Sequence, residues 1–284
     1  MKPQLYINFN GTLYKNEEHI FSINNRAFKY GDALFETIRV IDGKLCFVED
    51  HFKRLKMGID LLKMKSSNLS FNELKTQIEE LVQKNGIHQG GRVRLTVFRE
   101  AEGFYQPNNE KKSYTIEAKP IDVNYYQLNT KGLVVDMFNE HRRSTSKLSN
   151  IKTTNSIQQI LAGIYRKENN LDECIMVNKH DRIAEASSSN VFLYKNNNIY
   201  TPALDEGSMD GVMRKQVLKI AEQLNINVFE GMVNGSMLLQ ADELFLTNAV
   251  KGIQWVETFR SKTYTNEAAQ SFLQELNKAL SANQ

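Results

Sequence analysis

Hydrophobic and polar residues alternate with a changing period along the first part of the chain, and these changes predict both strands and helices. The apolar residues 4–8 predict a strand that runs into a turn at Asn10-Gly11. Residues 33–51 predict two further strands on either side of a turn at 42–43, where Asp is followed by Gly. Short apolar runs bounded by turn residues are typical of a sheet.

Two amphipathic helices are predicted next, over residues 45–64 and 71–86. In both segments the apolar residues recur three and four positions apart, so they share one face of a helix. Such a face must be buried, and the neighbouring sheet is the natural surface to cover it. These apolar faces consist of Phe52, Leu55, Ile59 and Leu62 in the first helix and Ile78, Leu81 and Val82 in the second.

Residues 119–132 lack a clear period, and we expect them to connect two domains. A smaller α/β domain, residues 1–118, would precede this connection, and a larger domain, residues 133–284, would follow it. Strands and helices are mixed in both parts, which predicts an α+β fold. The remaining expected elements are strands over 92–98, 113–118, 133–139 and 173–178, short strands within 182–202, helices over 153–170, 211–225 and 265–284, and a helix, a strand and a glycine-containing loop over 233–256.

The composition is that of an ordinary globular protein without a strong charge bias. Of the 284 residues, 24% are charged and 41% hydrophobic, and 36 Lys and Arg against 33 Asp and Glu give a net charge of +3. This charge is too small to favour nucleic acid or a membrane surface as a partner. No stretch reaches the roughly 18 apolar residues of a membrane span. The first residues also lack the apolar core of a signal peptide, so we expect a soluble cytoplasmic protein.

Cysteine and histidine usage argues against a disulfide framework and against a metal site. Cys46 and Cys174 each lie in an apolar run, which is typical of a buried small hydrophobic residue. The five histidines do not cluster at the spacing of metal ligands. We therefore predict no bound metal, and the chemistry has to come from other side chains.

Lys152 and Glu185 are two candidate functional residues whose local sequence leaves alternatives open. A lysine just before an amphipathic helix, as in KTTNSIQQIL, is usually a solvated side chain. Glu185 lies in the apolar run IAEA, so it is either buried with a cationic partner or exposed on an alternating strand. Neither residue indicates a function by itself.

Several basic residues and one helix start are suited to binding anions. Gly211 begins a predicted helix, with Asp210 as a possible N-cap, and the N–H groups of a helix start bind phosphate well. Arg92 and Arg94 share one face of a strand because strand side chains alternate, so they are either both exposed or paired with anions. Such residues would suit carboxylate recognition. The same holds for Arg142 and Arg143, which follow the strand expected over 133–139.

These features occur in an order that resembles the class IV aminotransferases, the fold type IV group of pyridoxal-phosphate enzymes. This group includes branched-chain aminotransferases, D-amino-acid aminotransferases and 4-amino-4-deoxychorismate lyases. The resemblance runs nearly from end to end. It implies a two-domain fold like that of D-amino-acid aminotransferase, with pyridoxal 5′-phosphate bound by the larger domain, and a homodimer. The matching segments are INFNGTL, NRAFKYGDALFETIRVIDGKL, DHFKRL, KTTN, IAEASSSNVF, DGVMR and ADELFLTNAV.

The resemblance also implies roles for individual residues. KTTN matches the family's K-x-x-N, so Lys152 would be the catalytic lysine that binds the cofactor covalently. Lys147 is the nearby competitor, but it has no Asn three residues later. Glu185 would contact the pyridine nitrogen, while Arg54 and the start of the helix after Gly211 would bind the phosphate. The implied cofactor-binding residues are Arg54, Lys152, Glu185, Asn190, Val212, Met213, Asn248 and Ala249, and the implied substrate-binding residues are Tyr30, Glu36, Arg92, Arg94 and Arg142.

One segment departs from the branched-chain aminotransferase pattern and bears on the reaction. These enzymes usually carry Ser-Gly-Thr near the phosphate, whereas this chain has Thr247, Asn248 and Ala249. Together with Gly-Val-Met at 211–213, this segment resembles the 4-amino-4-deoxychorismate lyases, which release pyruvate and p-aminobenzoate for folate synthesis. A branched-chain or related amino-acid aminotransferase is the alternative, followed by a D-amino-acid aminotransferase. A binding protein that kept the fold without the cofactor is the alternative from another class.

Overall fold

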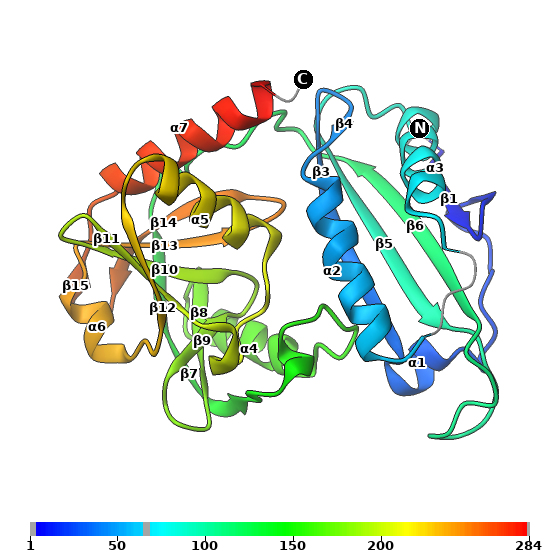
Figure 1. Ribbon diagram of the computed structural model, residues 1–284, viewed down its shortest axis with the longest axis horizontal. Coiled ribbons are helices and arrows are strands. Elements are labelled where there is room, and N and C mark those ends of the chain that lie inside the picture. Colours follow the sequence, from blue (N-terminus) through cyan, green and yellow to red (C-terminus); the bar gives the residue numbers. More distant parts are fainter. Residues whose placement is uncertain (1–3, 65–68, 283–284) are drawn as a thin grey trace. The chain divides into compact units, whose positions relative to one another are not determined.

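The computed structural model describes residues 4–64 and 69–282, and the chain forms two compact units. The first unit comprises Met1–Tyr125 and Ile151–Asn155, and the second comprises Tyr126–Asn150 and Ser156–Gln284. Each unit combines helices with a β-sheet, which confirms the α+β fold (Figure 1). The expected connection, residues 119–132, is divided between the two units, and residues 151–155 belong to the first.

The first unit is built on a six-stranded antiparallel sheet with the order β2-β1-β6-β5-β3-β4. Its first hairpin turns at Asn10 and Gly11, and both have positive φ, as the sequence predicts for this pair. The long strands lie at the centre of the sheet and position the side chains discussed below. The strands are β1 (Tyr6–Phe9), β2 (Thr12–Lys15), β3 (Ala33–Ile41), β4 (Lys44–Leu45), β5 (Gly91–Arg99) and β6 (Lys112–Pro120).

Helices α2 (Val48–Leu61) and α3 (Phe71–Lys84) cover one face of this sheet. Their predicted apolar faces are confirmed, since Phe52, Leu55, Ile59, Ile78, Leu81 and Val82 are buried in one core with alternate residues of β3, β5 and β6. The other residues of these strands point to the opposite side, here called the open face of the sheet. The short α1 (Arg26–Tyr30), which the sequence pattern did not indicate, precedes β3.

The second unit contains a nine-stranded mixed sheet with the order β12-β11-β10-β13-β14-β7-β8-β9, with β15 paired to β14. Helices α5 and α7 pack on each other, and both contact β13, while α4 packs on β7 and β8. The strands are β7 (Leu133–Arg143), β8 (Glu173–Asn178), β9 (Ile183–Ala186), β10 (Asn190–Lys195), β11 (Asn198–Pro202), β12 (Asn227–Gly231), β13 (Glu243–Asn248), β14 (Gly252–Phe259) and β15 (Lys262–Thr263). The helices are α4 (Ile157–Glu168), α5 (Val212–Gln223), α6 (Gly235–Gln240) and α7 (Glu267–Ala282), with 3₁₀ turns η1 (Lys147–Ser149) and η2 (Leu204–Glu206).

Three predicted boundaries in this unit were wrong. The helix expected over 153–170 begins only at Ile157, since the residues before it pair with the first unit's β3. The strand expected over 133–139 continues to Arg143. Gly252 has positive φ and ends a tight turn, so the residues expected as a loop form strand β14. The final helix was expected to reach residue 284, and residues 283–284 lie outside the described part.

Candidate active site

Lys152 lies on the first unit's sheet rather than at an exposed helix start. Its backbone carbonyl accepts a hydrogen bond from the N–H of Phe35 at 2.9 Å, and Thr153 forms an isolated bridge with Leu34. The side chain is half-buried, and its Nζ lies 4.6 Å from the centroid of the Phe35 ring. Lys147, by contrast, is exposed in η1. The fold therefore gives Lys152, and not Lys147, a partly enclosed and partly apolar environment.

Arg94 lies on the open face of the same sheet, next to the same aromatic ring. Its guanidinium carbon is 3.9 Å from the centroid of Phe35, and Glu117 is its neighbour on β6. Burial lowers the pKa of Arg94, the Glu117 carboxylate opposes this shift, and the charge of Arg92 adds to it. Arg92 shares this face, as predicted, but is exposed. Phe35 therefore lies beneath two cations, the Lys152 amine and the Arg94 guanidinium.

Glu36 points to the helix-covered side of the sheet, which corrects the expectation that it faces a substrate. It is 1% exposed, and its Oε2 lies 2.6 Å from His51 Nδ1 and 2.5 Å from Arg54 Nη2. Arg54 Nε also donates to its Oε1 at 2.9 Å. The reason is strand alternation, because Phe35 faces the open side and the next residue must face the helices. Glu36 thus holds Arg54, whereas the sequence associated it with Tyr30.

Burial and the neighbouring charges shift the pKa values of Glu36 and His51 in this cluster. Burial alone would raise the pKa of Glu36, but the charge of Arg54 and hydrogen bonds from His51 and Arg54 outweigh it and bring the pKa down to about 2. Burial lowers the pKa of His51, and the Glu36 carboxylate only partly opposes this. At neutral pH the cluster therefore contains an ionised Glu36 that balances Arg54.

We expect Glu36→Gln to destabilise the protein at pH 7 and to flatten its stability at acid pH. The folded pKa of Glu36 lies below the ordinary value of 4.5, so the carboxylate stabilises the fold above pH 4.5 and loses this effect as the pH falls toward 2. Removing it leaves Arg54 buried without its counter-charge, at a cost of about 3–5 kcal/mol. Urea unfolding between pH 2 and pH 7 measures both effects.

Glu117→Gln is the matched control for this experiment, because Glu117 is a half-buried carboxylate on the open face of the same sheet. It should change the free energy of unfolding by less than about 1 kcal/mol. An unchanged acid-dependent loss of stability in Glu36→Gln would contradict the role given to this pair.

Glu185 is buried with a cationic partner, which decides between the two alternatives left by the sequence. It is 5% exposed on β9, its Oε1 lies 2.9 Å from Arg143 Nη2, and its Oε2 accepts a hydrogen bond from the N–H of Met209 at 3.1 Å. Arg142, expected to bind substrate, instead forms a 2.6 Å surface ion pair with Asp181. Residues 139–142 at the end of β7 are exposed and the register against β8 shifts between Phe138 and Arg143, so that of this pair only Arg143 is buried.

The start of α5 is shaped by the close approach of Asn190. Gly211, and not Asp210, is the N-cap, and a Cβ atom on Gly211 would collide with Asn190 Oδ1. Asp210 instead pairs with Lys215, with a 3.2 Å separation. The amide of Asn190 donates to Ser208 Oγ at 3.1 Å and to the carbonyl of Met209 at 2.9 Å. A larger residue at 211 would therefore displace the Asn190 side chain from these two hydrogen bonds.

No side chain caps the first turn of α5, where Val212 and Met213 are both buried. Helix starts carry N–H groups without intrahelical partners and a partial positive charge, so this turn is suited to an anion. The sequence predicted this property from Gly211 alone, and the fold adds Arg143 and Asn190 in the segments that surround it.

Asn248 closes the turn that follows β13. Its Oδ1 accepts hydrogen bonds from the N–H groups of Val250 and Lys251 at 3.1 and 2.9 Å, and its Nδ2 donates to Ser189 Oγ at 3.1 Å. The carbonyl of Ala249 accepts the Tyr126 hydroxyl at 2.7 Å. Asn248 therefore shapes this turn, and only its neighbour Thr247 carries a hydroxyl, which is buried.

Tyr30 ends α1 at the edge of the open face. Its ring lies 5.7 Å from that of Tyr105 and 4.9 Å from the guanidinium of Arg26. Within residues 4–64 and 69–282 there is no group of His, Cys, Asp and Glu side chains that could hold a metal ion. None of the described helices is long and apolar enough to cross a membrane.

The predicted site residues thus form one group in each unit. Lys152 and Arg94 meet at Phe35 in the first unit, with Arg54 held below the sheet. The second unit brings together Glu185, Asn190 and the start of α5. Sequence reasoning missed the position of His51 and the pairing of Arg143 with Glu185. A basic residue at a strand end was the signal for Arg143, but it did not distinguish this residue from its neighbour.

Comparison with known proteins places these features in a family. The family model described as amino-transferase class IV matches residues 33–259. A D-alanine aminotransferase of Bacillus licheniformis is 27% identical over 96% of this chain and 94% of its own length, and an aminodeoxychorismate lyase of Bacillus subtilis (strain 168) is 27% identical over 85% and 82%. A branched-chain aminotransferase of Thermoproteus uzoniensis has the same fold, with a TM-score of 0.88 over 96% of this chain and 93% of its own, at 22% identity.

Proposed function

Because the chain belongs to the class IV aminotransferase family, whose members depend on pyridoxal 5′-phosphate, we propose that it holds this cofactor with Lys152, Arg54, Glu185 and the start of α5. Each of these groups has the chemistry that one part of the cofactor needs. The half-buried amine of Lys152 suits the aldehyde, and the uncapped helix start suits the phosphate. Glu185 is buried but ionic, with Arg143 as its partner, which suits a protonated ring nitrogen.

Four side chains would each have a separate role in the reaction. When bound, pyridoxal 5′-phosphate withdraws electrons from the substrate carbon that carries the amine. Lys152 would remove the proton from this carbon and return it elsewhere, as a general base and then a general acid. Glu185 would keep a compensating negative charge in place, and Arg54 would neutralise phosphate charge. Arg94, a guanidinium on an aromatic ring, would hold a substrate carboxylate.

For the reaction, we propose a 4-amino-4-deoxychorismate lyase that produces pyruvate and p-aminobenzoate. The observation that supports it is the turn at Asn248, whose side-chain oxygen accepts hydrogen bonds from two backbone N–H groups. Branched-chain aminotransferases usually carry Ser-Gly-Thr in this segment. In this reaction the ring carbon that carries the amine loses its proton, the C–O bond between the neighbouring ring carbon and the three-carbon unit breaks, and the ring becomes aromatic. The three-carbon unit leaves as enolpyruvate, which takes up a proton to become pyruvate. The substrate has carboxylates for Arg94 to bind.

One set of assays separates the lyase from the transaminases. The enzyme is incubated with aminodeoxychorismate, and pyruvate and p-aminobenzoate are measured. It is then incubated with 2-oxoglutarate and either leucine or D-alanine, and glutamate is measured. The lyase proposal requires pyruvate and p-aminobenzoate in equal amounts. Rapid glutamate formation without pyruvate release would instead identify an aminotransferase.

An amino-acid aminotransferase is the second candidate. It is supported by the D-alanine aminotransferase of Bacillus licheniformis, which matches over 96% of this chain. The amino acid that gives the faster glutamate formation separates a branched-chain enzyme from a D-amino-acid enzyme. Purified protein without the yellow absorption of a bound cofactor would contradict both the lyase and the aminotransferase and favour a cofactor-free binding protein.

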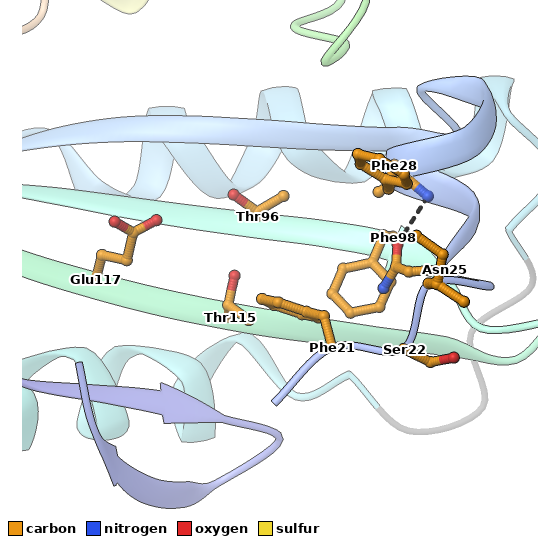
Figure 2. A pocket seen from close by; sticks show the side chains of 10 residues that line it. Phe21, Ser22, Asn25, Phe28, Thr96, Phe98, Thr115 and Glu117 are labelled. Atoms are coloured by element: carbon orange, nitrogen blue, oxygen red, sulfur yellow. Dashed lines mark hydrogen bonds between the residues drawn. The ribbon is translucent and has the colours of Figure 1, made fainter. Parts of the chain in front are cut away.

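We also propose a homodimer that uses the open face of the first unit's sheet. A cavity of about 550 Å³ lies here, and Figure 2 shows Phe21, Phe28 and Phe98 gathered around it. Phe28 is 76% exposed and Phe104, in a nearby loop held by Arg26, is 84% exposed. Soluble monomers rarely expose such a cluster of large apolar side chains. Arg94 and Glu117 add both signs of charge to this face, so it can pair with a second copy of itself.

We expect Phe28→Asp to convert the dimer to a monomer. The exposed side chain makes little contribution to its own subunit's core, whereas a charge in an apolar interface costs several kcal/mol of association. Light scattering at fixed protein concentration measures the mass. Met57→Asp is the control, since Met57 is 46% exposed on α2, on the other side of the sheet. A monomeric wild-type protein, or a dimeric Phe28→Asp, would contradict this surface.

A further inference from the structure

We propose that Asn150 is a positioning residue that holds the loop before α5 in the shape needed to bind phosphate. This inference rests on the proposed function, because it takes the start of α5 as the phosphate site. Neither the family match nor the sequence pattern indicates Asn150. Its role follows from three hydrogen bonds to one loop of the second unit.

Asn150 is bonded to both ends of the segment that enters α5. Its Nδ2 donates to the carbonyls of Leu204 and Ser208, both at 2.7 Å. Its own carbonyl accepts from the N–H of Asp210 at 3.1 Å. Asn150 thus connects residues 204, 208 and 210 of the loop that leads to the Gly211 N-cap. The direction in which the first N–H groups of α5 point depends on how the chain arrives there.

The same loop is held from other elements by three further side chains, two of which have proposed cofactor roles. Asn190 donates to Ser208 and Met209, and Glu185 accepts from the N–H of Met209. Asn178 donates to the carbonyl of Glu206 at 3.0 Å. Asn150 is the one among these that lies outside the β8–β10 region, so its bonds fix the loop against a separate part of the second unit.

The test compares two ligands that differ only in the phosphate. Dissociation constants of pyridoxal 5′-phosphate and of pyridoxal are measured on cofactor-depleted full-length protein by absorbance. Asn150→Ala should weaken binding of the phosphorylated ligand at least about tenfold and that of pyridoxal less than about twofold, because only the former uses the loop. Asn150→Ser, which keeps one donor and perturbs folding less, should give an intermediate ratio.

Asn85→Ala is the matched control. The amide of Asn85 also donates to two backbone carbonyls, those of Tyr6 and Ala118, both at 2.9 Å, but in the first unit. It should lower the melting temperature and leave the ratio of the two dissociation constants unchanged. If Asn150→Ala and Asn150→Ser also leave the ratio unchanged while wild type binds the cofactor, the positioning role is wrong and the proposed function stands. Wild type that binds neither ligand overturns both.

Discussion

Lys152→Ala is expected to abolish the absorption band of the bound cofactor and to reduce turnover at least about 10³-fold.

 In the proposed site this amine would bind the aldehyde and then move the proton, and its removal would eliminate both functions. Its half-buried position above the Phe35 ring suits this role, because the ring and the sheet shield the amine from bulk water. Absorbance of the purified variant and the assays above measure both effects.

Lys147→Ala is the control for this variant. Lys147 lies only five positions earlier in the sequence, but it is exposed in η1 and should retain the band and full turnover. Reduction of the wild-type enzyme with borohydride, followed by peptide mapping, should locate the cofactor on Lys152. A label on Lys147, or loss of the band only in Lys147→Ala, would show that the lysine has been misassigned.

Glu185→Gln should reduce turnover by about 10²-fold or more while leaving the cofactor bound. The amide keeps the shape of the side chain and removes its negative charge, so a protonated ring nitrogen would lose its compensating charge. It would also leave Arg143 buried at 2.9 Å from a neutral group, which lowers stability by a few kcal/mol. The pH dependence of the cofactor band is the decisive measurement, because a purely structural defect would not shift it.

Glu243→Gln provides the comparison for Glu185→Gln. Glu243 is 2% exposed in the same unit, and it accepts hydrogen bonds from the N–H groups of Ala268 and Ala269 at the start of α7. Its replacement should lower the melting temperature without changing the pH dependence of the band. If both variants shift the band equally, or if Glu185→Gln retains full turnover, Glu185 does not have the proposed role.

The two basic residues at the end of β7 show how one position changes the chemistry of a site. Arg142 and Arg143 are adjacent, yet one forms a surface pair with Asp181 and the other is buried against Glu185. The sequence identified a basic pair after a strand, but it predicted that the strand ends at residue 139. The strand instead continues to Arg143 with a shift in its register against β8, and only this last side chain is buried.

Local patterns were sufficient for most elements of the fold. The periodicity of α2 and α3 and the Asn10-Gly11 turn each depend on residues that are close in sequence, so they could be predicted without contacts. The start of α4 could not, because the residues before it pair with a strand that lies more than 100 positions earlier. The segment is polar enough for a helix start, and only its distant partner shows that it is extended.

The sequence by itself determined the family, since the order of the short motifs can be read directly along the chain, and it predicted Lys152 as the cofactor lysine from the Asn three positions later. The tertiary structure decided which charges meet. It placed Glu36 against Arg54 and His51 below the sheet, paired Glu185 with Arg143, and brought Asn150 to carbonyls 54 and 58 positions away. The physical reason is that ion pairs and loop anchors depend on which side of a strand a residue faces and on which segments pack together. Neither is encoded in the neighbouring residues alone.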